Sequence, residues 1–184
     1  MEKVKTIQKS KIFLSRKAIH ITGTILLSGI GIALPRIFHI LAGSSAGAIF
    51  LPMHIAVLIA SLVFGALSGS IVGVVSVIGS YLLTGMPAIA RLPYMIIELG
   101  IYAILLGLFR KKFNAAVSLV GAMIFGRILY AGVLFVSISM LGFSSYGISV
   151  IESVKMGIPG ILLQIAFVPV IAKIMNKGLN LKND

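Results

Sequence analysis

Residues 50–87 read FLPMHIAVLIASLVFGALSGSIVGVVSVIGSYLLTGMP, without a single Asp, Glu, Lys or Arg. As one helix rising about 1.5 Å per residue, this stretch would overshoot the ~30 Å hydrocarbon core of a bilayer. The segment Gly65-Ala66-Leu67-Ser68-Gly69 offers a natural place for a turn. The stretch therefore predicts two membrane-spanning helices, at about 48–64 and 67–84, joined by a tight turn flanked by glycine.

The rest of the chain has the same apolar character. Of its 184 residues, 59% are hydrophobic and 11% are charged, whereas soluble domains average about 25% charged residues, and the mean hydropathy is +1.13. Six spans of about 20 residues would use roughly 120 positions, which leaves no room for a separate soluble domain. We expect an all-α integral membrane protein in which residues 1–184 form one compact bundle of six transmembrane helices, at about 18–34, 48–64, 67–84, 92–109, 114–140 and 151–174.

The positions of Lys and Arg predict how this bundle is oriented. With both termini cytoplasmic, basic residues collect inside at the N-terminal segment 1–17, at 110–112 and near the C-terminus, whereas Arg36 and Arg91 lie outside. The formal net charge of +12 is then a signal of topology, and no nucleic-acid partner is expected. The first span is expected to stay uncleaved, because the small-residue site at 46–48 lies beyond the usual ~15 to 30 residues of a signal peptide.

Several kinds of chemistry have no residues to support them. The chain has no Cys, and it contains no HExxH, no Gly-x-Ser-x-Gly and no phosphate-binding Gly-x-x-x-x-Gly-Lys-Ser/Thr motif. We therefore expect no catalytic residue, no metal site and no cofactor in this chain, and any ATP must be hydrolysed by a partner. The three histidines, His20, His39 and His54, are interpreted as interfacial or packing residues rather than as metal ligands.

Two ionisable residues inside the spans are predicted to lie at the same depth. Glu98 is about 9 Å inward from the outer end of its helix, and Arg127 is about 20 Å from the inner end of its helix, which leaves about 10 Å to the outer side. Tyr130 and Lys155 also fall in this outer half, and Gln164 lies deeper.

Charged residues inside a membrane span face a partner or a wet cavity. An ion pair that only locks the bundle would explain Glu98 and Arg127. A ligand cavity open to the outside is the favoured interpretation, because Arg91, Arg127 and Lys155 outnumber the nearby acidic residues Glu98 and Glu152. The same surplus of positive charge suggests an anionic group on the ligand.

Four sequence features suggest a family. The Phe-Leu-Pro-Met-His entry to the second span, the glycine-divided hairpin, the Leu-Thr-Gly-Met-Pro exit and the sequence Glu98-Leu99-Gly100-Ile101-Tyr102 resemble the substrate-binding S component of energy-coupling factor (ECF) vitamin transporters. The six-span layout extends this resemblance to nearly the whole chain.

The resemblance implies a multi-pass protein of the bacterial cell membrane, surrounded by lipid, that captures a water-soluble vitamin at the outer face. Its partners would be a transmembrane T component and two ABC-type ATPases, which use the ATP. The family's cavity lies in the outer half of segments four to six, under the loops at about 35–48, 84–92 and 141–150. The candidate substrate-binding residues are Glu98, Tyr102, Arg127, Tyr130, Lys155, Gln164 and Arg91.

In this family a small-xxx-small pair on the first helix, often Ala-xxx-Ala, packs against the T component. The present chain departs from that form, since it offers Thr24-xxx-Ser28 or Gly29-xxx-Ala33. Either pair is a candidate docking surface.

Other interpretations stay open. A small membrane enzyme acting on a lipid or isoprenoid would use Glu98, Arg127 and His54 as its polar centre. A gated channel is disfavoured, because the inner half of the bundle has almost no polar lining. Among vitamins, pantothenate or a folate fits the surplus of positive charge, and cobalamin or a modified-base precursor is also open.

Overall fold

The computed structural model describes residues 2–43, 45–141, 150–179 and 181. Every regular element in these ranges is helical, and six helices are long and apolar enough to cross a membrane. The all-helical fold class is therefore confirmed together with the number of candidate spans. The elements are α1 Glu2–Ala42, α2 Ala46–Phe50, α3 Pro52–Phe64, α4 Ala66–Thr84, the short 3-10 helix η1 Ile89–Arg91, α5 Leu92–Phe109, α6 Ala115–Leu141 and α7 Val150–Gly178.

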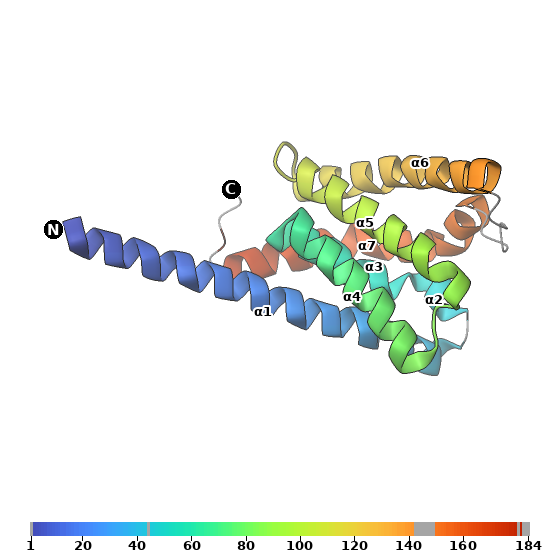
Figure 1. The fold of residues 1–184 in the computed structure, drawn as a ribbon, viewed down its shortest axis with the longest axis horizontal. Helices are drawn as coiled ribbons and strands as arrows, with labels where there is room; N and C mark the ends of the chain where they lie inside the picture. The colour runs from blue at the N-terminus through green and yellow to red at the C-terminus, as the bar shows by residue number, and fades with distance from the viewer. Residues whose placement is uncertain (1, 44, 142–149, 180, 182–184) are drawn as a thin grey trace.

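The helices alternate in direction along the bundle. Figure 1 shows that α1 begins and α7 ends on one side, and that α1 extends beyond the other helices there. We call the opposite side, where α1 ends and α3 and α5 begin, the distal end. The positions of α4, α5 and α6 agree with the expected spans to within one residue at each end. Apolar length alone was enough to predict these three.

The first helix is longer than expected. We predicted that Pro35 would end it and that 35–48 would be a loop, but α1 runs through Pro35 to Ala42. A proline removes one helical hydrogen bond, whereas ending the helix would release several backbone groups in an apolar environment, so continuing is the cheaper outcome. The loop expected at 84–92 contains η1, and residues 142–149 of the loop expected at 141–150 lie outside the described residues.

The second span is broken, where one continuous helix was expected. Leu51 separates α2 from α3 and adopts a left-handed conformation, with φ 48° and ψ 48°. Pro52 follows it as the first residue of α3. A proline disfavours the helical conformation for the residue before it, and its own missing N–H costs nothing at the start of a helix.

α3 is the central helix of the bundle. It contacts α1, α4, α5 and α7, and all of its residues except Ile55 are buried. A helix that is apolar around its whole circumference belongs in an interior position. The residues that α3 presents to its neighbours are therefore candidates for any interior site.

Small residues let the central helices approach closely. A Cβ atom at Gly69 of α4 would meet Ser61 of α3 and would lie 3.1 Å from the Cβ of Ala103 on α5. A Cβ atom at Gly73 would lie 3.2 Å from the Cβ of Leu99. The stripe of small residues on α4 is thus used for packing inside the bundle.

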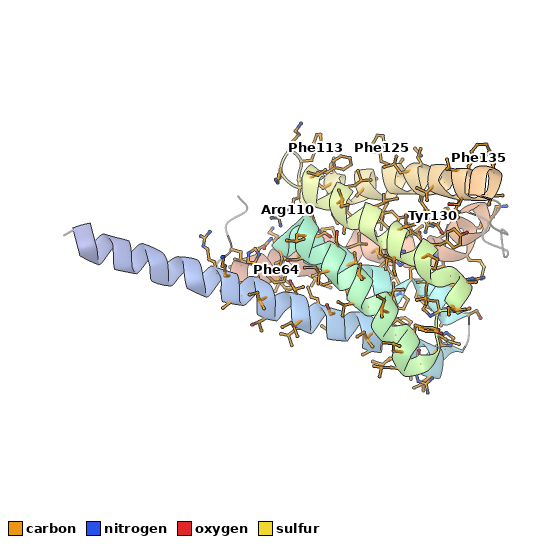
Figure 2. The ribbon with its side chains drawn as sticks, viewed as in Figure 1. Phe64, Arg110, Phe113, Phe125, Tyr130 and Phe135 are labelled. Carbon is orange, nitrogen blue, oxygen red and sulfur yellow. The ribbon has the colours of Figure 1, made fainter. Side chains whose placement is uncertain are left out.

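The outer surface is apolar on most sides. Figure 2 shows Phe125 and Phe135 pointing away from the bundle on α6, where they are 55% and 71% exposed. Leu83 on α4 is 75% exposed and Ile25 on α1 is 65% exposed. Soluble monomers rarely expose contiguous apolar patches of this kind, so this surface is typical of a protein that faces lipid.

Candidate ligand-binding site

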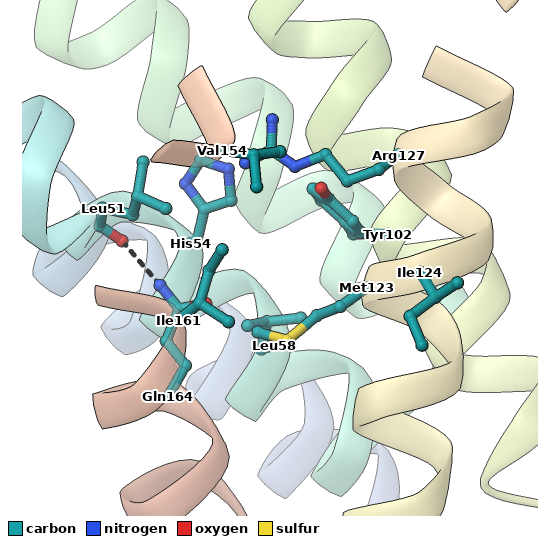
Figure 3. A pocket seen from close by; sticks show the side chains of 10 residues that line it. All are labelled: Leu51, His54, Leu58, Tyr102, Met123, Ile124, Arg127, Val154, Ile161 and Gln164. Carbon is teal, nitrogen blue, oxygen red and sulfur yellow. Dashed lines mark hydrogen bonds between the residues drawn. The ribbon is translucent and has the colours of Figure 1, made fainter. Parts of the chain in front are cut away.

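A cavity of about 290 Å³ lies among α3, α5, α6 and α7, toward the distal end (Figure 3). Its wall is mostly aliphatic, with a polar cluster on one side. Such a composition suits a ligand with an apolar body and a few polar groups. The lining residues are Leu51, His54, Leu58, Tyr102, Met123, Ile124, Arg127, Val154, Ile161 and Gln164.

An ion pair between α5 and α6 forms the centre of the polar cluster. Arg127 Nη1 lies 2.7 Å from Glu98 Oε1, and the two side chains are 13% and 9% exposed. The equal depths predicted from the two helix ends thus correspond to a direct contact. Arg127 lines the cavity, whereas Glu98 lies behind it and holds the guanidinium in place.

Tyr102 completes this part of the wall. It lies one turn after Glu98 on α5, is 3% exposed, and its ring centroid is 5.8 Å from Arg127 Cζ. Gly126 on α6 makes room for it, because a Cβ atom there would lie 2.5 Å from Tyr102 Cε1. The residue before Arg127 must therefore be very small for α5 and α6 to meet at this point.

His54 is a site residue that our sequence reasoning assigned to packing. It lies in the first turn of α3, is 6% exposed and lines the cavity. Its Nε2 atom is 3.8 Å from Glu98 Oε1, and its ring centroid is 5.8 Å from that of Tyr102. Counting residues from the helix ends could have placed His54 near the level of Glu98, because both residues follow the start of a helix at the distal end by only a few positions.

Gln164 closes the opposite side of the cavity. It is 1% exposed, and its Nε2 atom donates a hydrogen bond of 3.3 Å to the carbonyl oxygen of Leu51. Figure 3 shows this bond reaching from α7 to the break before α3. The predicted depth of Gln164, below the charged cluster, agrees with this position.

The remaining predicted binding residues lie outside the cavity wall. Tyr130 is buried one turn beyond Arg127 on α6. Lys155 is exposed although its neighbour Val154 lines the cavity, and Arg91 is exposed at the end of η1. The side chain of Glu152 lies outside the described residues.

The two candidate docking pairs on α1 face different ways. Thr24 and Ser28 are 9% and 6% exposed and point into the bundle, where Ser76 of α4 donates a 3.5 Å hydrogen bond to the Ser28 carbonyl. Gly29 and Ala33 are exposed. The structure therefore corrects the first alternative, because a pair used for packing against α4 is not available to a partner.

The described part of the chain offers no cluster of metal-ligating side chains. It contains no group of three or more His, Cys, Asp or Glu side chains that could hold a metal ion. Three buried atoms in it lack a hydrogen-bond partner: His54 Nδ1, His54 Nε2 and Glu98 Oε1. The arrangement can therefore present charge and hydrogen-bonding groups to a ligand.

Fold and site together define an all-helical protein with six helices able to span a membrane and a partly polar cavity among four of them. No family model, no curated protein and no solved structure matches the chain.

Proposed function

We propose that this protein is the substrate-binding S component of an ECF-type importer, and that it captures a small water-soluble vitamin or related micronutrient at the outer face of a bacterial cell membrane. The observation that carries the proposal is the cavity of about 290 Å³ beside the Glu98–Arg127 pair. A buried ion pair on a cavity wall is costly unless it is well partnered, and this is typical of a functional site in a membrane protein.

The position of the cavity supports this proposal. On α3, α5 and α7 the lining residues come from the distal half or the middle of the helix, whereas Met123 and Ile124 lie in the other half of α6. With cytoplasmic termini the distal end is the outer side, so the ligand would enter from outside. The volume lies near the lower limit of about 300 to 1,000 Å³ for ligand sites, which favours pantothenate over the larger folate and cobalamin.

Partners supply the energy in this proposal. The chain has no phosphate-binding loop, so a transmembrane T component and two ABC-type ATPases would couple ATP hydrolysis to release of the ligand inside. The exposed pair Gly29 and Ala33 on α1 provides a small-residue surface for the T component.

Mass spectrometry of small molecules retained after gentle purification tests the proposal directly. We expect one water-soluble compound at near-equal molar ratio to the chain, and we expect added compound to raise the melting temperature. The chain alone in liposomes should bind this compound without accumulating it. Uphill uptake by the chain alone, in the absence of ATP and of an ion gradient, would contradict the proposal.

A lipid-modifying enzyme is the second candidate, and the 3.8 Å separation of His54 Nε2 and Glu98 Oε1 favours it specifically. A histidine beside a carboxylate is a common arrangement for general acid–base catalysis. Turnover of a lipid or isoprenoid by the purified chain would identify the enzyme, whereas binding without turnover supports the S component.

A further inference from the structure

The unpartnered polar atoms gather at one place on the cavity wall. His54 Nδ1, His54 Nε2 and Glu98 Oε1 make no hydrogen bond to the described residues, although Oε1 is in charge contact with Arg127 at 2.7 Å. The His54 side chain is 7% exposed and lines the cavity. Buried polar groups are nearly always hydrogen-bonded, so the imidazole of His54, which reaches the cavity, indicates where a ligand group binds.

The break in the second span gives this place a positive potential. Leu51 and His54, both on the cavity wall, belong to the first turn of α3, a helix of 13 residues. Pro52 has no N–H, and the His54 N–H donates to the Leu51 carbonyl at 3.0 Å. This end of α3 therefore acts mainly through its dipole, which favours a negative charge beside His54 and disfavours an isolated imidazolium.

The charges of the cluster balance without a ligand while His54 is neutral. Glu98 and Arg127 cancel each other, and neutral His54 offers one donor and one acceptor. A protonated imidazole offers two donors: Nε2–H faces Glu98 Oε1, and the other N–H is available to a ligand. The extra positive charge would be costly in a buried site unless the ligand carries a negative one.

Among the described residues, the ionisable groups placed beside His54 come from two helices. Glu98 and Tyr102 belong to α5, and Arg127 belongs to α6. The described residues of α7 on the cavity wall, Val154, Ile161 and Gln164, do not ionise.

We infer that the ligand carries a carboxylate that binds the imidazole of His54 at the start of α3. This inference rests on the proposed function. Arg127, fixed by Glu98, adds positive charge beside the carboxylate, and the aliphatic wall takes the rest of the ligand. The wall residues from Leu58 to Ile124 supply this apolar surface.

Matched pairs of probes test the ligand group. The detergent-purified full chain is titrated with pantothenate and panthenol, nicotinate and nicotinamide, biotin and biotinamide, and lipoate and lipoamide. Each neutral compound lacks only the carboxylate charge. We expect at least one carboxylate to bind about 10- to 100-fold more tightly than its neutral counterpart, as for a charge-assisted hydrogen bond.

Substitution of His54 tests which residue binds the carboxylate. His54→Gln should abolish most of the preference for the carboxylate over its neutral counterpart. His39→Gln is the matched control, since His39 lies on α1 outside the cavity wall.

The outcomes separate this inference from the proposed function. Equal binding of each carboxylate and its neutral counterpart overturns the inference and leaves vitamin capture intact. A preference for the carboxylate that survives unchanged in His54→Gln also overturns it. A chain that retains no small molecule and is stabilised by none of the probes contradicts both. The comparison of carboxylates with their neutral counterparts uses wild-type protein, so it does not depend on whether the variants fold.

Discussion

The side-chain amide of Gln164 on α7 donates a hydrogen bond of 3.3 Å to the backbone carbonyl of Leu51, the left-handed residue between α2 and α3. The same carbonyl accepts the N–H of His54 at 3.0 Å. Gln164 therefore ties α7 to the broken span from which His54 enters the cavity. This contact joins residues 113 positions apart in the chain.

Gln164→Met should lower the free energy of unfolding by about 1 kcal/mol, the usual net value of such a hydrogen bond. The loss should stay moderate, because the Leu51 carbonyl keeps its bond to His54. Ligand affinity should fall as well, since the start of α3 is held less firmly. Thermal unfolding in detergent and ligand titration measure both effects. Leu163→Met, at a site 39% exposed, is the control and should change neither.

Gly160→Ala should destabilise the fold by about 1 to 3 kcal/mol, because overpacking displaces the backbone. A Cβ atom at residue 160 would lie 2.6 Å from both the carbonyl carbon and oxygen of Phe50, so α7 would have to move away from α2. Gly132→Ala on α6 is the matched control, with nothing within 4 Å of the new Cβ. It should be neutral or stabilising by up to about 1 kcal/mol. Equal melting temperatures for the two variants would contradict the close contact.

Arg127→Met should lower the free energy of unfolding by about 3 to 5 kcal/mol, because it leaves Glu98 buried without its cationic partner. It should also weaken ligand binding. The double variant Glu98→Gln, Arg127→Met removes both charges at similar volume, and it should recover most of the stability.

Ligand affinity in that double variant separates two roles of the pair. Recovered stability with lost binding supports a role in the site. Wild-type affinity would show that the pair is purely structural. Unfolding and binding are measured on the same preparations, so a folding defect is not mistaken for a binding defect.

Arg91→Cys should react with a membrane-impermeant maleimide added to intact cells, because both termini are predicted to be cytoplasmic. Lys112→Cys should react only after permeabilisation. The native chain contains no cysteine, so each label reports one position. Labelling of residue 91 only from the cytoplasmic side would reverse the orientation and place the distal end inside.

Depth in the bundle was predictable from the sequence, and rotation of the helices was not. Each helix rises by a fixed distance per residue, so counting from the ends placed Glu98 and Arg127 at one level, and they are in contact. Which face each helix turns to its neighbours depends on packing. Thr24 and Ser28 therefore turned inward, and Lys155 turned outward, without a signal in their own segment.

His54 shows why part of the site needed the tertiary structure. Its own segment is apolar and contains no partner for an imidazole. Its neighbours Glu98 and Tyr102 come from α5, and they reach it because α3 occupies the centre of the bundle. Contacts between helices distant in the chain leave no periodic pattern in either segment.

The sequence by itself determined the all-helical class and the number of candidate spans, because runs of apolar residues and the glycines between them act within one helix. It also determined the level of the charged pair. Only the tertiary structure decided that Thr24 and Ser28 face the bundle, that Gln164 reaches Leu51 and that a cavity lies beside His54. These features depend on neighbouring helices, which supply the hydrogen-bond partners and the close contacts that local sequence cannot provide.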